Sequence, residues 1–572
     1  MTDLKKIIEN IENKNFDEAL KLCALYENKK NKHIILNFKG VINHRKNDLE
    51  KAEIDFLNSS KIDKNFADPI KNLYLIYLKK GSIKNLLSSA KKLVEIDKSN
   101  NLYIYQLAYA FEANNKLDEA INYYKIYLSS NGVNKKAALN NIGAIYLKKN
   151  QPRISLNYLL EAINLGEDKI IINNTLNCFI KLRDSKNADL YYDKAKDIDE
   201  NFEEFIYNKA EYLIFKNKID DALEILKTHK DKPKFFITLL NLYFNLGQNY
   251  EGYKLIDLSK DKIEKNPEFF RYYGFWSLTR GDFDIGWKYY EYRNSKKLNY
   301  FNGVKEWSGE NIQKKSIVVF NEQGLGDSIQ FSKYIYPLIK IANHVTFVVQ
   351  ENIKNIFTDK IENLSVENME NCKYKKYDFK IALGSLIKFF YKKKFKPNES
   401  IINYDLDFKL EEKIHSQKLN VGFSWSGSFN GPNEPYRSIP LKSLQNVFSL
   451  DANFYCLQNK IRESDLDVFD SLNLIDYGKY RLDELASIIK KLDLIIAVDT
   501  SILHLSAEFK KETWALFTLY PDWRWGDFNK FNPYSNLKIF KQNVFNDWTN
   551  VETLLVNELN KKILKFNKSI IS

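Results

Sequence analysis

Small residues recur at intervals close to 34 positions through the first half of the chain, and this period constrains the fold more than any other feature. The series, with spacings of 30 to 35 residues, is Ala19, Ala52, Leu86, Ala120, Ser155, Ala188, Ala222, Gly252 and Gly286. A second small residue stands twelve positions before five of these, at Gly40, Ala108, Gly143, Ala210 and Gly274. The pattern is typical of stacked helix–turn–helix units, whose small side chains let paired helices approach closely. Because each pair buries its apolar face only against its neighbours, we expect an α-solenoid.

The sequence within the units supports this interpretation. FDEAL (16–20), LDEAI (117–121) and IDDAL (219–223) begin second helices with carboxylates in the first turn, where the helix dipole favours negative charge. Period and motifs resemble the tetratricopeptide repeat, in about nine units over residues 1–295, of which the third, sixth and eighth are degenerate. The aromatic last unit, GDFDIGWKYYEYR (281–293), is expected to cap the stack against the following domain.

Near residue 300 the period ends, and short apolar runs alternate with helix-length connections. The first set of runs is SIVVF (316–320), VTFVV (345–349) and FKIAL (379–383). The second set is NVGFSW (420–425), NFYCLQ (453–458), LIDYG (474–478), LDLIIAV (492–498) and ETWALF (512–517). Strands joined by helical crossovers predict parallel sheets, and two sets predict two Rossmann-like lobes facing a cleft. We place these lobes at 300–412 and 413–547, before a C-terminal helix and tail at 548–572.

Charge and cysteine usage exclude several classes of protein. The formal net charge of +13 comes from 87 basic and 74 acidic residues, and no block combines arginine with interleaved aromatic residues in the manner of a nucleic-acid site. We therefore expect no nucleic-acid partner, although a general attraction to nucleotide phosphates is consistent with the charge. The four cysteines form no CxxC pair, which indicates neither disulfides nor a zinc site. Without a signal-type run or a membrane span, the expected location is the cytoplasm.

The first candidate site is the turn that follows the run SIVVF. Gly324, Gly326 and Asp327 stand where an apolar strand runs into an amphipathic helix. Glycines at such a turn let backbone amides point at a ligand, and the helix amino terminus favours negative charge. Two interpretations of Asp327 stay open, namely the N-cap of the helix and a catalytic carboxylate.

The second candidate site follows the run LDLIIAV. Asp499, Thr500 and Ser501 end a strand rich in β-branched residues, and His504 lies in the first turns of the next helix. Hydroxyl groups and free amides at this turn form a cradle for phosphate. From there His504 can donate a hydrogen bond to a diphosphate; the alternative is a histidine packed between helix and sheet.

Several motifs together resemble a bacterial group that joins tetratricopeptide repeats to a domain similar to the heptosyltransferases, the family 9 glycosyltransferases. They are Trp307, the glycine turn ending in Asp327, VGFSWSG (421–427), YRSIP (436–440), CLQ (456–458), VDTSILHLSA (498–507) and PDWRWG (521–526). The resemblance implies a GT-B fold, with the first lobe on the acceptor side and the second on the nucleotide-sugar side. It also implies a nucleotide-sugar donor and inversion at the anomeric carbon, with no metal or other cofactor.

The resemblance also assigns roles to individual residues. Asp327 falls on the proposed general base, and Asp499, Thr500 and His504 fall on the donor-binding segment. Arg437 replaces a lysine that meets the donor phosphates, which keeps the charge and adds a bidentate fork. The remaining donor-side candidates are Ser424, Ser426, Ser501 and Arg524, with Gln458 as the nearest counterpart of an acidic residue that grips the donor ribose. Trp523 and Trp525 are expected to pack between the lobes.

These observations favour a glycosyltransferase whose repeat array holds an acceptor, either a protein or a glycan. The main alternative is an inactive repeat scaffold that mediates protein–protein interaction. A nucleic-acid-associated repeat protein is a third hypothesis, which rests on net charge alone. The sequence leaves the sugar, the nucleotide base and the acceptor open.

Overall fold

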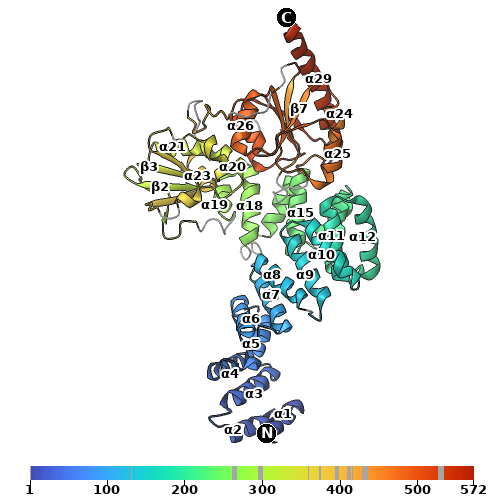
Figure 1. Cartoon of the computed structure of the whole chain (residues 1–572), viewed down its shortest axis with the longest axis vertical. Helices are drawn as coiled ribbons and strands as arrows, with labels where there is room; N and C mark the ends of the chain where they lie inside the picture. The colour runs from blue at the N-terminus through green and yellow to red at the C-terminus, as the bar shows by residue number, and fades with distance from the viewer. Residues whose placement is uncertain are drawn as a thin grey trace. The chain divides into compact units, whose positions relative to one another are not determined.

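The computed structural model divides the chain into two compact units, Met1–Lys216 and Asn217–Ser572 (Figure 1). It describes residues 2–130, 132–259, 267–293, 300–358, 360–372, 375–392, 399–408, 414, 417–427, 436–525 and 534–571. Residues 295 and 413, at two of the expected domain boundaries, and Gly526 of the PDWRWG segment lie outside these ranges.

The first unit consists of helices in antiparallel pairs that follow one another along the chain (Figure 1). They are α1 (Thr2–Glu12), α2 (Phe16–Tyr26), α3 (Lys32–Arg45), α4 (Leu49–Ile62), α5 (Ala67–Lys80), α6 (Ile83–Ile96), α7 (Asn101–Ala113), α8 (Leu117–Ser129), α9 (Lys135–Lys148), α10 (Pro152–Asn164), α11 (Lys169–Leu182), α12 (Ser185–Asp199) and α13 (Glu203–Phe215). Helix pairs recur at the period of the small residues, which confirms the predicted tetratricopeptide array.

The small residues lie where two helices of a pair come closest. A Cβ atom on Gly40 of α3 would lie 2.6 Å from the ring of Phe56 in α4. One on Gly143 of α9 would lie 2.7 Å from Leu159 in α10, and Ser155 donates a hydrogen bond to the Gly143 carbonyl at 2.6 Å. Larger side chains at these positions would force the helices apart.

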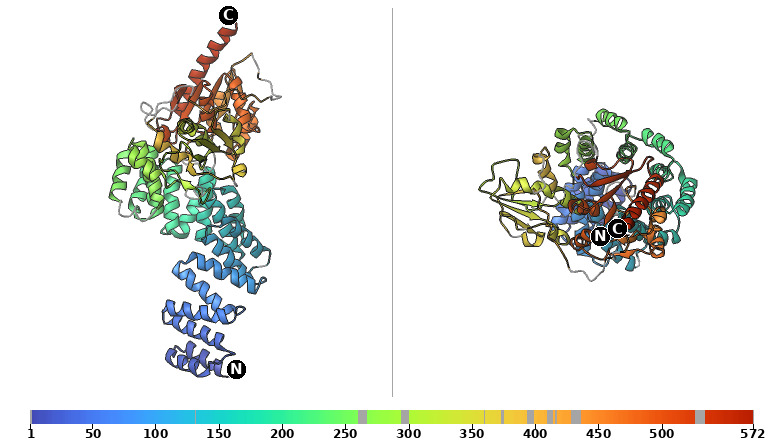
Figure 2. Two further views of the ribbon diagram at one scale, coloured as in Figure 1. Left: turned by 90° about the vertical axis from the view of Figure 1, so that its left-hand side faces the viewer. Right: turned by 90° about the horizontal axis from the view of Figure 1, so that it is seen from above.

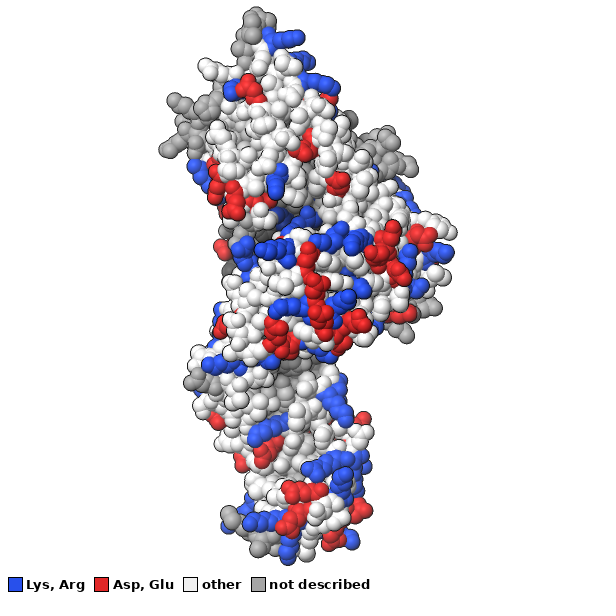
Figure 3. Space-filling model, turned by 90° about the vertical axis from the view of Figure 1, so that its right-hand side faces the viewer, with Lys and Arg blue, Asp and Glu red and all other residues white. Residues whose placement is uncertain are grey.

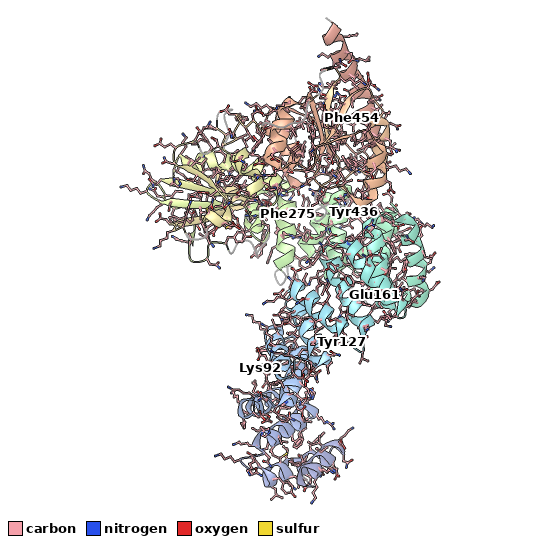
Figure 4. All side chains as sticks on the ribbon, in the orientation of Figure 1. Lys92, Tyr127, Glu161, Phe275, Tyr436 and Phe454 are labelled. Carbon is pink, nitrogen blue, oxygen red and sulfur yellow. The ribbon has the colours of Figure 1, made fainter. Side chains whose placement is uncertain are left out.

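Asparagines one period apart link the first helices of successive pairs. Asn72 of α5 donates to Asn37 of α3 at 3.2 Å, and Asn174 of α11 donates to Asn140 of α9 at 2.9 Å. Such paired amides satisfy polar groups that are partly buried between neighbouring units. Large aromatic residues are also buried in the array, including Tyr127 of α8, which is labelled in Figure 4.

The second unit begins with the remaining helices of the array. They are α14 (Ile219–Thr228), α15 (Pro233–Leu246), α16 (Asn249–Leu258), α18 (Pro267–Thr279) and α19 (Phe283–Tyr290). Gly274 of α18 allows the closest approach, because a Cβ atom there would lie 2.7 Å from the backbone of Tyr289 in α19. The last pair is therefore packed backbone to backbone, immediately before the first sheet.

A parallel sheet of five strands forms the first lobe, in the order β1-β5-β2-β3-β4. The strands are β1 (Lys305–Glu306), β2 (Ser316–Phe320), β3 (His344–Val348), β4 (Leu364–Glu367) and β5 (Phe379–Ala382). The helical segments are α20 (Leu325–Phe331), η2 (Ser332–Tyr334), α21 (Ile335–Ile339), η3 (Glu351–Ile356), α22 (Met369–Cys372) and α23 (Leu383–Phe390). Strands β2, β3 and β5 are almost wholly buried, as expected for a parallel sheet covered by helices.

A parallel sheet of six strands forms the second lobe, in the order β11-β10-β9-β6-β7-β8. The strands are β6 (Asn420–Ser424), β7 (Asn453–Cys456), β8 (Ile475–Asp476), β9 (Leu494–Val498), β10 (Thr513–Phe517) and β11 (Leu537–Lys541). The helical segments are η4 (Leu441–Leu444), α24 (Gln445–Phe448), η5 (Glu463–Asp465), α25 (Leu466–Ser471), α26 (Leu482–Lys491), α27 (Ser501–Glu508), η6 (Trp523–Trp525) and α29 (Thr549–Ile571). Read from β8, this is the strand order of the Rossmann fold.

The architecture confirms the predicted class, a tetratricopeptide solenoid followed by two Rossmann-like lobes of the GT-B type. Every strand predicted from the sequence is present, with ends shifted by a few residues. The sequence analysis missed β1, β4 and β11. Each of these lies at a sheet edge, β1 is exposed and β11 is only partly buried, so their residues lack a continuous apolar run.

Helix α29 packs its first half on the second lobe and extends beyond it (Figure 2). Val551, Leu555 and Leu559 are buried one turn apart in the core that also holds Phe454 of β7, labelled in Figure 4. No helix in the described part of the chain is both long enough and apolar enough to span a bilayer. Basic and acidic side chains are interspersed on the face shown in Figure 3, in keeping with a diffuse distribution of charge.

Candidate active site

Each sheet has one point at which the strand order reverses, and both candidate turns lie at these points. In the first lobe the reversal is between β2 and β5, and β2 leads into Gly324 and Asp327. In the second lobe it is between β6 and β9, and β9 leads into Asp499 and Thr500. The crevice outside the carboxyl ends of the strands at such a switch point is where open α/β sheets bind ligands.

The two turns are in contact with each other. A Cβ atom on Gly326 would lie 2.9 Å from Cδ2 of His504 and 3.5 Å from Cα of Ser501. Any side chain at position 326 would push α20 away from the amino terminus of α27. Glycine at this position therefore lets the turns that carry Asp327 and His504 pack against each other.

Asp327 caps its helix and faces the second lobe at the same time. The N-cap is Gly324, not Asp327, because the helix begins earlier in the turn than the sequence suggested, at Leu325. Asp327 is instead the third helical residue, and its Oδ2 accepts a hydrogen bond from the Gly324 amide at 3.0 Å. Its Oδ1 lies 2.5 Å from Nη2 of Arg524. The two oxygens thus divide between a capping contact and an ion pair.

Arg524 is held by three side chains from both lobes. Besides Asp327, it contacts Oδ1 of Asp522 at 2.6 Å and Oε1 of Gln323 at 3.3 Å. Its flanking residues Trp523 and Trp525 are buried, as expected for packing residues. A guanidinium clamped between carboxylates is a fixed positive charge at the edge of the crevice.

His504 is buried and oriented on both sides of its ring. It stacks on Trp525 with centroids 5.2 Å apart and planes 16° from parallel, and its Nδ1 lies 3.1 Å from the hydroxyl of Tyr534. Its Nε2 lies 3.7 Å from Oδ1 of Asp499. Burial lowers the pKa of His504 to about 3, despite the opposing effect of Asp327. The ring is therefore neutral near pH 7, and a neutral ring can form hydrogen bonds but carries no charge.

The carboxyl ends of β6 and β9 supply hydroxyl groups and a cation. Within the described residues, Ser426 Oγ and Thr500 Oγ1 are buried without a hydrogen-bond partner. Arg437 donates from Nη1 to the carbonyl of Asp499 at 3.2 Å. Burial raises the pKa of the Asp499 carboxyl, and the charge of Arg437 opposes this rise. A buried polar atom without a partner calls for an explanation, and a ligand bound at the switch point, which both hydroxyl groups border, would supply one.

Ser424 and Gln458 lie deeper in this region. Ser424 is the last residue of β6 and is buried. Gln458 accepts a hydrogen bond from the Ser426 amide at 2.8 Å and donates one to the Lys460 carbonyl at 2.8 Å. Both ends of its amide hold the local backbone, so contact with a donor ribose would require one of these bonds to be exchanged.

Four residues that contact the site were missed by the sequence analysis: Tyr290, Gln323, Asp522 and Tyr534. Gln323 stands directly before the glycine turn and Asp522 within PDWRWG, so their positions beside recognised motifs were the available signal. Tyr290 belongs to the repeats and Tyr534 lies thirty residues from His504, so no local pattern links either to the crevice.

The chain is similar in part to one protein family and to several solved structures. Residues 458–551 match the model of glycosyltransferase family 9 (heptosyltransferase). MamA of strain AMB-1 is 17% identical over 29% of this chain and 91% of its own, with a TM-score of 0.26. YrrB, described as a TPR protein with an unusual peptide-binding site, is 21% identical over 31% of this chain and 91% of its own, with a TM-score of 0.26. PilF of Pseudomonas aeruginosa is 14% identical over 36% of this chain and 97% of its own, with a TM-score of 0.30. No curated protein matches the chain.

Proposed function

We propose that this chain, a tetratricopeptide-repeat protein with a family 9 glycosyltransferase region, transfers a sugar from a nucleotide-sugar donor to an acceptor. The transfer inverts the anomeric carbon and needs neither a metal nor another cofactor. The second lobe holds the donor, and the first lobe presents the acceptor hydroxyl. We assign the protein to the cytoplasm, in keeping with its four buried thiols, none of which forms a disulfide.

The observation that carries the proposal is the contact of the two turns at Gly326. It brings a carboxylate, Asp327, and a phosphate-type turn, Thr500 to His504, to one crevice at the switch points of both sheets. Transfer of a sugar from a diphosphate requires a base for the acceptor and a separate group of donors for the leaving diphosphate. The turn of the first lobe supplies the base, and the turn of the second lobe supplies the donors.

In the proposed reaction, Asp327 takes the proton of the acceptor hydroxyl as its oxygen attacks the anomeric carbon. The bond from that carbon to the diphosphate breaks, and the negative charge collects on the diphosphate oxygens. Arg437, the Thr500 hydroxyl and the neutral His504 ring then stabilise that charge by hydrogen bonds that strengthen as the bond breaks. Arg524 orients the Asp327 carboxylate, whose oxygens have further lone pairs for the acceptor proton, and an incoming diphosphate offers Arg524 a second anion.

The repeat array supplies the acceptor in this proposal. Stacked helix pairs form an extended surface that suits a polypeptide better than a small molecule. Its last pair leads directly into the acceptor lobe within the second unit. We therefore propose a protein acceptor, with a glycan as the other class to test.

Binding of nucleoside diphosphates tests the donor site. We expect calorimetry to detect UDP, GDP, ADP or CDP binding, and Arg437→Ala to weaken it by about tenfold or more, since a hydrogen bond to a charged group contributes about 1.5–3 kcal/mol. Arg280→Ala, at a turn of the repeats, is the control and leaves the affinity unchanged. Absence of binding by all four diphosphates, or equal affinity in Arg437→Ala, would contradict the assignment.

A further inference from the structure

The end of the last helix pair of the array packs against the residues that lead into the glycine turn of the first lobe. Arg293, just after α19, is buried, and its Nη2 lies 2.7 Å from Oε1 of the fully buried Glu322. The same guanidinium donates to Ser385 at 2.7 Å, and Glu322 accepts from the Gly384 amide at 3.2 Å. A paired charge at this depth fixes α19 against the ends of β2 and β5, because separating the pair would leave a buried charge without a partner.

One residue further along the turn, the same helix pair makes a second contact. The hydroxyl of Tyr290 donates to Oε1 of Gln323 at 3.0 Å and accepts from Nε2 of the same amide at 2.8 Å. Burial raises the pKa of Tyr290 above its usual range, so the hydroxyl stays protonated and able to donate. Because the hydroxyl contacts both atoms of the amide, it holds the Gln323 side chain in place, although a group that both donates and accepts fits either orientation of the amide.

The orientation of the Gln323 amide affects the ion pair between Arg524 and Asp327. Oε1 of Gln323 also accepts from Nη2 of Arg524 at 3.3 Å, and the same nitrogen contacts Asp327. If the amide turned over, its NH₂ group would face the guanidinium, and two donors would oppose each other. Arg524, which can only donate, selects the arrangement in which Oε1 faces it, and the Tyr290 hydroxyl holds the amide within reach of Arg524.

We propose that Tyr290, a residue of the repeat array, is a positioning residue of the transfer site and acts through Gln323 on the Arg524–Asp327 pair. This inference rests on the proposed function. It makes the last repeat part of the catalytic centre, since one of its side chains sets the geometry beside the base. The acceptor-holding array and the reacting groups thus share a residue.

The ring of Tyr290 has a separate role in packing. It contacts Phe275, labelled in Figure 4, with centroids 5.7 Å apart, and Trp287 and Trp523 at 5.5 Å each. Phenylalanine at this position keeps these contacts and removes only the hydroxyl. Tyr290→Phe therefore separates positioning from packing.

The test is a double-mutant cycle on transfer activity with Tyr290→Phe and Arg524→Lys. We expect Tyr290→Phe alone to lower kcat by about tenfold, which corresponds to about 1.4 kcal/mol, with little change in melting temperature. In the Arg524→Lys background we expect the same change to lower kcat by less than about twofold, because residues that act through one another are not additive. Tyr253→Phe is the matched control, since it removes a hydroxyl that donates to the Trp276 carbonyl at 3.1 Å within the repeats. It should leave kcat unchanged.

The possible results distinguish a failure of the positioning role of Tyr290 from a failure of the proposed function. A wild-type protein that turns over no nucleotide sugar overturns the proposed function. An active wild type with unchanged Tyr290→Phe, or with equal losses in both backgrounds, overturns the positioning role alone. If Tyr290→Phe does not fold, Gln323→Met replaces it in the cycle, with the same expected loss and the same non-additivity.

Discussion

Asp327→Asn lowers the rate of sugar transfer by about a thousandfold, because general base catalysis contributes about 10² to 10⁴ in rate. Asparagine keeps an oxygen that can accept the Gly324 amide, so the start of α20 is preserved. It cannot take a proton from the acceptor. The expected result is a fall in kcat with the affinity for nucleoside diphosphate retained, measured by initial rates and by calorimetry on the same preparation.

A matched control exists in the second lobe. Glu484 is the third residue of α26 and accepts a hydrogen bond from the Arg481 amide at 2.8 Å, which is the same capping contact. Glu484→Gln should leave the rate unchanged. If Asp327→Asn retains more than about a tenth of wild-type activity, the carboxylate is a helix cap and an ion-pair partner and does not serve as the base.

His504→Ala is the second change with a large expected effect, a loss of about a hundredfold in kcat, since removal of one preorganised donor costs about 10² to 10³. The histidine is held by Trp525 and Tyr534 in an orientation that a smaller residue cannot reproduce. Initial rates at saturating donor give the effect on the chemical step. His344→Gln, at the start of β3, is the control and should leave kcat unchanged.

The pH profile gives an independent check on the role of His504. Its pKa of about 3 means that the folded protein keeps the ring neutral while the unfolded chain binds a proton below about 6.5. Acidification between these two values therefore lowers stability, and the contribution is restored as pH rises through that window. The pH–activity profile of the wild type should show no inflection near pH 6.5 that is due to His504, so in this region it should match the profile of His504→Gln. Such an inflection would mean that the ring acts as a charged acid.

The sequence predicted the fold well where burial leaves a simple pattern. The period, marked by small residues at eight of its nine positions, and the apolar runs of the central strands follow directly from close packing. The edge strand β11 was missed because only Phe540 among its five residues is buried, so its charged residues concealed the strand. Edge strands carry less of the apolar signal that sequence reading depends on.

The site was predictable as two turns but not as one constellation. Asp327, Asp499 and His504 stand next to strand ends, where local sequence reveals them. The ion pair of Asp327 with Arg524 joins residues 197 positions apart, and the Tyr290 contact crosses from the repeats into the first lobe. Such contacts depend on how lobes and helices pack, which a single sequence does not encode in any local period.

Release of nucleoside diphosphate from a panel of nucleotide sugars, by the wild-type chain and by Asp327→Asn in parallel, tests the central claim most directly. The claim is that the residues of the two turns that meet at Gly326 catalyse sugar transfer from a diphosphate-linked donor. It predicts turnover of at least one donor by the wild type, and about a thousandfold less by the variant. Binding of a nucleoside diphosphate without release from any donor sugar would contradict the claim, and would leave a ligand-binding repeat scaffold as the function.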